Sequence, residues 1–107
     1  MQETESNIVS AICDYLAARK HFYWRQNTAP AFDWKTNSFR RMPKHAMKGV
    51  PDIILIKKGS GQFIGLEVKR KGTVQSPEQI EFERRAKADG ASYHVVRSID
   101  DVQRLGL

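Results

Sequence analysis

Two acids and one lysine, Asp52, Glu67 and Lys69, have types and a spacing that suit the binding of a divalent cation. If the two acids face each other across paired strands, their Cβ atoms lie roughly 5 Å apart, where like charges are unfavourable. A hard, oxygen-preferring cation between the carboxylates would turn this repulsion into attraction. Because side chains alternate along a strand, Lys69 lies on the same face as Glu67. The three residues therefore predict a metal site beside an ammonium group.

A β-hairpin must position these residues. The apolar run at 53–56 is followed by Gly59-Ser60, which predicts two antiparallel strands joined by a two-residue loop, with Lys58 facing Gly61. Facing residues then have numbers that sum to 119, which places Asp52 opposite Glu67. The remaining side chains of the second strand divide between a core face and a charged face, where Gly65 would leave room for a cation; the core-facing residues are Ile64, Leu66 and Val68.

Composition limits the class of protein. The 107 residues predict a single domain, 1–107, and the net charge of +6 favours an anionic partner, of which nucleic acid is the commonest. Cys13 is the only cysteine, so neither an internal disulfide nor a thiolate metal site is expected. No apolar stretch is long enough to cross a membrane and the N-terminus is too polar for a signal peptide, so we expect a cytoplasmic protein.

An amphipathic helix is predicted from residue 3 to about residue 20, with Thr4 or Ser6 as its cap. Its apolar positions recur at helical spacing and are Ile8, Ile12, Tyr15 and Leu16. Glu5 extends this stripe at its N-terminal end. It is either a functional acid or a first-turn acid that the helix dipole favours, and Glu3 competes with it for a functional role.

A strand at 21–26 leads into a segment at 27–48 without a clear pattern, part of which, at 38–42, could form a strand. A long segment of this kind is often functional. Its basic residues, interleaved with aromatic ones, suit contact with phosphates and bases; they are Arg40, Arg41, Lys44 and Lys48. The alternative is a solvated basic loop.

A second helix is predicted from Ser76 to about Asp89, because Ser76, Pro77 and Gln79 form a capping box with proline at the first helical position. Gln79 could serve this cap or reach toward the carboxylates. A short strand at 93–96 and a last helix that begins at Ser98 follow, with Val102 and Leu105 expected to point inward. This order of elements predicts an α/β fold in which helices flank a mixed sheet and the hairpin is central.

The motifs resemble those of a known nuclease family. Pro51-Asp52 with Glu67-Val68-Lys69 is similar to the signature of the PD-(D/E)xK nuclease superfamily, and the fuller pattern resembles its VRR-NUC family. The further similar pieces are Glu5 with Ile8, Lys48-Gly49-Val50 before the Pro-Asp pair, Gly65-Leu66, Ser76 to Gln79, and Gly90-Ala91 leading to Val95-Val96-Arg97. Ser98 stands where the family has a second arginine, which puts DNA contacts there in doubt.

The resemblance implies a restriction-endonuclease-like αβββαβ(α) core and a Mg²⁺- or Mn²⁺-dependent endodeoxyribonuclease. Asp52, Glu67 and the backbone carbonyl of Val68 would hold the metal, with Glu5 joining directly or through water. Lys69 would orient the attacking water and stabilise charge on phosphorus, and Gln79 would orient groups around the metal.

The resemblance also implies branched DNA, such as a four-way junction, as the substrate and a homodimer as the assembly. Outside the segment at 27–48, the basic residues expected to meet DNA are Lys57, Lys58, Arg70 and Lys71. The alternatives are a nicking or restriction-like endonuclease and a DNA-binding module that does not cut. Without the resemblance, Asp52 could be a strand-start acid and Glu67 with Lys69 an exposed ion pair.

Overall fold

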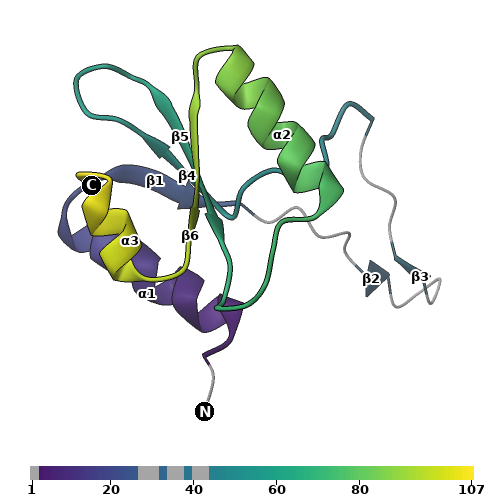
Figure 1. Cartoon of the computed structure of the whole chain (residues 1–107), viewed down its shortest axis with the longest axis horizontal. Helices are drawn as coiled ribbons and strands as arrows, with labels where there is room; N and C mark the ends of the chain where they lie inside the picture. The colour runs from purple at the N-terminus through teal and green to yellow at the C-terminus, as the bar shows by residue number, and fades with distance from the viewer. Residues whose placement is uncertain (1–2, 27–31, 34–37, 40–43) are drawn as a thin grey trace.

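The fold is a mixed four-stranded sheet with helices on both faces (Figure 1). The structure is a computed structural model that describes residues 3–26, 32–33, 38–39 and 44–107. The strands are β1 (Phe22–Arg25), β4 (Ile53–Ile56), β5 (Phe63–Val68) and β6 (Ser92–Val96), and they lie in the order β1-β4-β5-β6. Only the pair β5–β6 is parallel. The predicted α/β class and the central position of the hairpin are confirmed.

A second, two-stranded sheet pairs β2 (Phe32–Asp33) with β3 (Ser38–Phe39). The strand that the sequence suggested at 38–42 is therefore present at its first two residues, and positions 40–42 lie outside the described residues.

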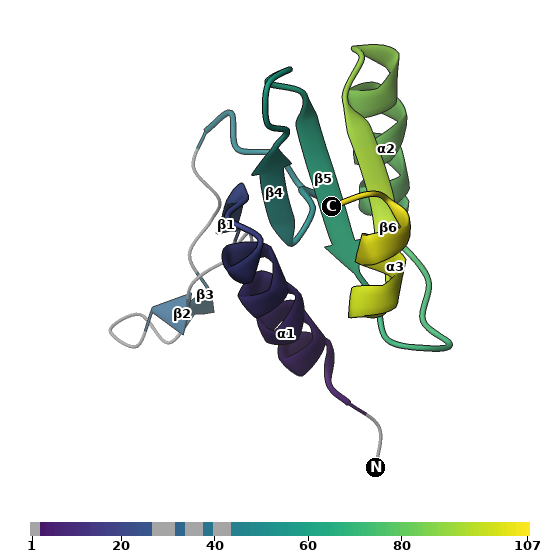
Figure 2. The same ribbon diagram turned by 90° about the vertical axis from the view of Figure 1, so that its left-hand side faces the viewer.

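The helices α1 (Glu5–Ala18) and α3 (Ile99–Arg104) lie together on one side of the sheet, and α2 (Pro77–Ala88) lies on the other (Figures 1 and 2). Thr4 caps α1, Ser98 caps α3, and the predicted capping box at Ser76 and Gln79 begins α2. No helix in the described part of the chain is long and apolar enough to cross a membrane.

The core lies between the sheet and the pair α1 and α3. Its members come from both helices, from the inner face of three strands and from the C-terminus: Ile8, Val9, Ile12, Leu16, Ile53, Leu55, Ile64, Leu66, Val68, Val96, Val102 and Leu107. The alternation predicted for the second hairpin strand is therefore correct. The inward position expected for Leu105 is wrong, because Leu105 is 37% exposed while Leu107 is 6% exposed. The Tyr15 hydroxyl donates to the Leu107 carbonyl at 2.7 Å, which ties the C-terminus to α1.

The hairpin has the predicted register but a different loop. Ile54 pairs with Gly65 and Ile56 with Phe63, as the sum of 119 requires. The loop is longer than two residues, because the Lys57 amide donates to the Gln62 carbonyl and the Gly61 amide donates to the Lys57 carbonyl. Lys58 and Gly61 thus belong to the loop rather than to a facing pair, and the longer loop keeps the register because it adds one residue to each side.

Candidate active site

Asp52 and Glu67 meet on the sheet face that α2 covers. Asp52 directly precedes β4, and its Oδ2 accepts a hydrogen bond of 2.8 Å from the amide of Val68. This bond fixes the carboxylate of Asp52 at the end of β5, next to Glu67. The carboxyl pair that the hairpin register predicted is therefore present.

Glu67 is 2% exposed and is the buried charged side chain among the described residues. Burial first, and then the charge and hydrogen bond of Asp52, raise the pKa of Glu67 from 4.5 to about 8. Lys69 acts in the opposite direction, so its ammonium group lies close enough to favour the ionised carboxylate. The proximity of Asp52 thus favours the neutral form of Glu67, and a divalent cation between the two side chains would favour the ionised form instead. The residues therefore fit a hard metal ion.

Gln79 performs both roles that the sequence left open. Its Oε1 accepts a hydrogen bond of 2.8 Å from the amide of Ser76, which completes the capping box of α2. Its Nε2 donates to Oε1 of Glu67 at 2.7 Å. Because one amide has an acceptor and a donor end, the cap that starts α2 also orients the buried carboxylate.

Tyr93 is a site residue that the sequence reasoning missed. It pairs with Gly65 across β5 and β6, is 1% exposed, and its hydroxyl donates to Oε2 of Glu67 at 3.4 Å. Burial and the nearby charge of Glu67 raise the pKa of its phenol, so the hydroxyl keeps its proton. The available signal was a tyrosine in a short strand that ends in two valines, since a buried tyrosine needs a polar partner.

Gly65 has a different role from the expected one. A Cβ atom at this position would lie 2.7 Å from Cγ of Pro51 and 3.4 Å from the Tyr93 ring. The space above the glycine is thus filled by Pro51 and Tyr93 and is not left for a cation. Its absent side chain lets Pro51 pack directly on β5.

Glu5 lies in the first turn of α1, where its Oε2 accepts a hydrogen bond of 3.4 Å from the Thr73 hydroxyl. Thr73 belongs to the segment that follows β5, so this contact brings the start of α1 to the carboxyl end of that strand. Within the described ranges no group of three His, Cys, Asp or Glu side chains forms a metal-binding cluster. The structure therefore brings Asp52 and Glu67 together without placing Glu5 among them. Glu3 is exposed.

The basic residues expected to meet DNA fall into two groups. The first group, Lys44, Lys48, Arg70 and Lys71, precedes or follows the hairpin in the sequence, and the second, Lys57 and Lys58, is at its tip; all six are exposed. Arg40 and Arg41 lie outside the described residues. The tip begins five residues from Asp52, or about 17 Å along an extended strand, so the two groups would contact different phosphates. The ammonium group of Lys58 also donates to the carbonyl of Arg19 at 3.0 Å.

Comparison with solved structures gives the fold a name. A structure described as "VRR_NUC domain" matches 94% of this chain and 91% of its own with a TM-score of 0.64 and 22% identity. A second, "VRR_NUC domain protein", matches 98% of this chain and 86% of its own with a TM-score of 0.69 and 21% identity. The chain has the VRR_NUC fold. This agrees with the resemblance in the motifs, and the VRR_NUC fold is of the restriction-endonuclease-like type that was predicted. Neither a protein-family model nor a curated protein matches the chain.

Proposed function

We propose that this chain is a metal-dependent endonuclease that hydrolyses DNA phosphodiester bonds. The observation that carries the proposal is the pairing of the half-buried Asp52 with the buried carboxyl group of Glu67, beside the ammonium group of Lys69. The VRR_NUC fold supports a nuclease activity, and the net charge of +6 supports a polyanionic substrate.

Asp52, Glu67 and the backbone carbonyl of Val68 would hold Mg²⁺ or Mn²⁺, with Glu5 contributing through water. When bound, the ion would polarise the scissile phosphate and lower the pKa of a water molecule. Val68 is fully buried and pairs with Val96 of β6, which holds its backbone in place beside the carboxylates.

The residues around the pair have separate tasks. Gln79 and Tyr93 each hold one oxygen of Glu67, which prepares the carboxylate for its ligand without further rearrangement. Lys69 orients the attacking water and stabilises the negative charge that develops on phosphorus. The basic residues that flank the hairpin hold the DNA backbone near the carboxylates.

The proposed substrate is branched DNA, including four-way junctions, and the proposed assembly is a homodimer. Two symmetric cuts require two active sites, which a two-fold symmetric dimer would supply. Both parts of this proposal rest on the resemblance to the VRR-NUC family.

The test is incubation of the purified protein with labelled four-way junction, flap, single-stranded and linear duplex DNA in Mg²⁺, Mn²⁺ or EDTA. We expect cleavage of the branched substrates in either metal and none in EDTA. Cleavage of linear duplex alone would replace the branched-DNA proposal by a restriction-like one, and absence of cleavage in every metal would refute the nuclease proposal.

The variant Lys69→Ala separates chemistry from binding. Removing a group that stabilises transition-state charge should lower kcat by about 10² to 10³. Lys87→Ala is the matched control, because Lys87 is an exposed lysine of α2 that pairs with Glu83. If Lys69→Ala and Lys87→Ala cut at the same rate, the role given to Lys69 is wrong.

A further inference from the structure

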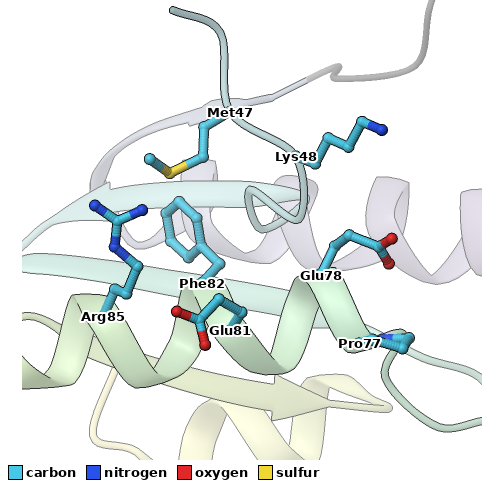
Figure 3. Close-up of a pocket in the computed structure, with 7 residues that line it drawn as sticks. All are labelled: Met47, Lys48, Pro77, Glu78, Glu81, Phe82 and Arg85. Carbon is cyan, nitrogen blue, oxygen red and sulfur yellow. The ribbon is translucent and has the colours of Figure 1, made fainter.

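A pocket of about 330 Å³ lies between α2 and the segment that precedes β4 (Figure 3). Met47 and Phe82 supply its apolar surface, and four charged residues surround them: Lys48, Glu78, Glu81 and Arg85. Figure 3 shows the side chains of Met47, Phe82 and Arg85 gathered around the same space. None of these residues except Lys48 has a part in the proposed function, and a volume near 300 Å³ is enough for a small planar ligand.

The pocket is connected to the carboxylate pair through the aromatic ring at its base. The rings of Phe82 and Tyr93 have centroids 6.0 Å apart, and the Tyr93 hydroxyl donates to Glu67. Phe82 also lies three residues after Gln79, or about 4.5 Å along the helix axis. The pocket and the carboxylates are therefore linked through one aromatic contact, which suits neighbouring nucleotides of one strand reaching both.

The segment that forms the other wall is held firmly against α2. Gly49 has a φ of +79°, and a Cβ atom there would lie 2.2 Å from the carbonyl oxygen of Glu78. This close approach requires glycine and sets the position of Lys48 and Met47 opposite Phe82. The pocket is thus built by the same Lys-Gly-Val-Pro-Asp segment that delivers Asp52.

The charges in the pocket favour a neutral planar group over a phosphate. Glu78 and Glu81 would repel an anion inside the pocket, although the side chain of Glu81 is engaged by Arg84. Within the described part of the chain, the side chain of Arg85 forms no hydrogen bond or ion pair, so its guanidinium group is available to stack on or donate to a ligand. An arginine, an aromatic ring and a methionine together suit a nucleobase, whose flat faces stack and whose edges accept hydrogen bonds.

We propose that this pocket binds an unpaired nucleobase of the DNA strand, one or two nucleotides from the phosphate at Asp52 and Glu67. The inference rests on the proposed function, and it gives a physical reason for selecting branched DNA. A base in a continuous duplex must leave its stack to enter the pocket, whereas a base at a branch point or flap is already free.

The test measures binding in EDTA, so it does not depend on cleavage. Fluorescence anisotropy would compare a flap DNA, the same flap with each unpaired nucleotide made abasic in turn, and a fully paired duplex. We expect one abasic position to weaken binding by wild-type protein about tenfold, which is the effect of losing one stacked base.

The variants Arg85→Ala and Met47→Ala should weaken binding of the intact flap by a similar factor and leave binding of that abasic flap and of the duplex unchanged. Arg104→Ala is the matched control, because it removes the same charge from exposed α3 on the opposite side of the sheet. Circular dichroism of each variant verifies the fold.

Two results would overturn the inference. One is wild-type binding that no abasic position weakens. The other is a variant that loses affinity equally for intact flap, abasic flap and duplex, which would make the pocket a phosphate contact. Failure of the nuclease proposal is distinguishable, because it would leave this metal-free binding pattern intact while no metal supports cleavage.

Discussion

The buried carboxyl of Glu67 should make the stability of the metal-free protein fall as pH rises. In the folded chain its pKa is about 8 against an ordinary 4.5, so between these values the folded state binds a proton that the unfolded state has released. The stabilising effect is complete below pH 4.5, declines through this window and is lost above pH 8. At 1.36 kcal/mol for each pH unit, the total decline has an upper value of about 5 kcal/mol.

Glu67→Gln tests this reasoning, because the amide keeps the size of the side chain and cannot ionise. Urea unfolding in EDTA at pH 5.5 and pH 8.5 should show a fall of about 2 to 4 kcal/mol in the free energy of unfolding for wild-type protein. We expect this fall in stability to be absent in Glu67→Gln. It should be retained in the control variant Glu3→Gln, in which the same substitution removes an exposed carboxylate.

Adding Mg²⁺ should restore wild-type stability more at pH 8.5 than at pH 5.5, because the cation competes with the proton of Glu67. It should have little effect on Glu67→Gln. An identical pH dependence in wild-type protein and Glu67→Gln would show that Glu67 is ionised in the metal-free fold, and the argument from the carboxyl pair would then be refuted.

Three further substitutions test the contacts around the pair. Gln79→Glu keeps an acceptor for the α2 cap but replaces the donor to Glu67 by a third acid, so activity should fall at least tenfold and the free energy of unfolding in urea should fall by about 1 to 3 kcal/mol. Tyr93→Phe removes one hydroxyl, and isothermal titration should show Mg²⁺ binding weakened by about tenfold with the fold intact. Gly49→Ala should cost about 3 kcal/mol or more in urea unfolding, from positive φ and the clash with α2, whereas Gly59→Ala, at φ +81° in open space, should cost about 1 to 2 kcal/mol.

The sequence predicted the hairpin well because two independent signals fixed it. The turn residues set the register, and alternation set the faces, so a wrong register would have buried charged side chains. The predicted loop was two residues too short, but the strand register was still correct, because Lys57 and Gln62 face each other in that same register. The capping box of α2 was equally predictable, because its residues lie close together in the sequence.

Contacts between distant segments could not be predicted in the same way. Tyr93 reaches Glu67 because β6 lies parallel to β5, and no local pattern states which residue of β6 faces Gly65. The close packing of Gly49 on Glu78 likewise depends on where α2 crosses the sheet. Helical spacing from Val102 favours Leu105 over Leu107, but α3 ends at Arg104 and the backbone takes a positive φ at Gly106, after which Leu107 lies in the core.

The dual role of Gln79 explains how the fold keeps the Glu67 carboxyl group buried, although burying such a group is unfavourable. A glutamate with 2% exposure beside a second acid would normally turn outward, whereas Glu67 stays inside with a raised pKa. Here the amide that orients it also begins a helix, so releasing Glu67 would leave the Ser76 amide without its acceptor and weaken α2. The same helix supplies Phe82 to the pocket beside Met47. The start of α2 therefore couples the carboxylate pair to the proposed base site, and substitutions at Gln79 should change metal binding and flap binding together.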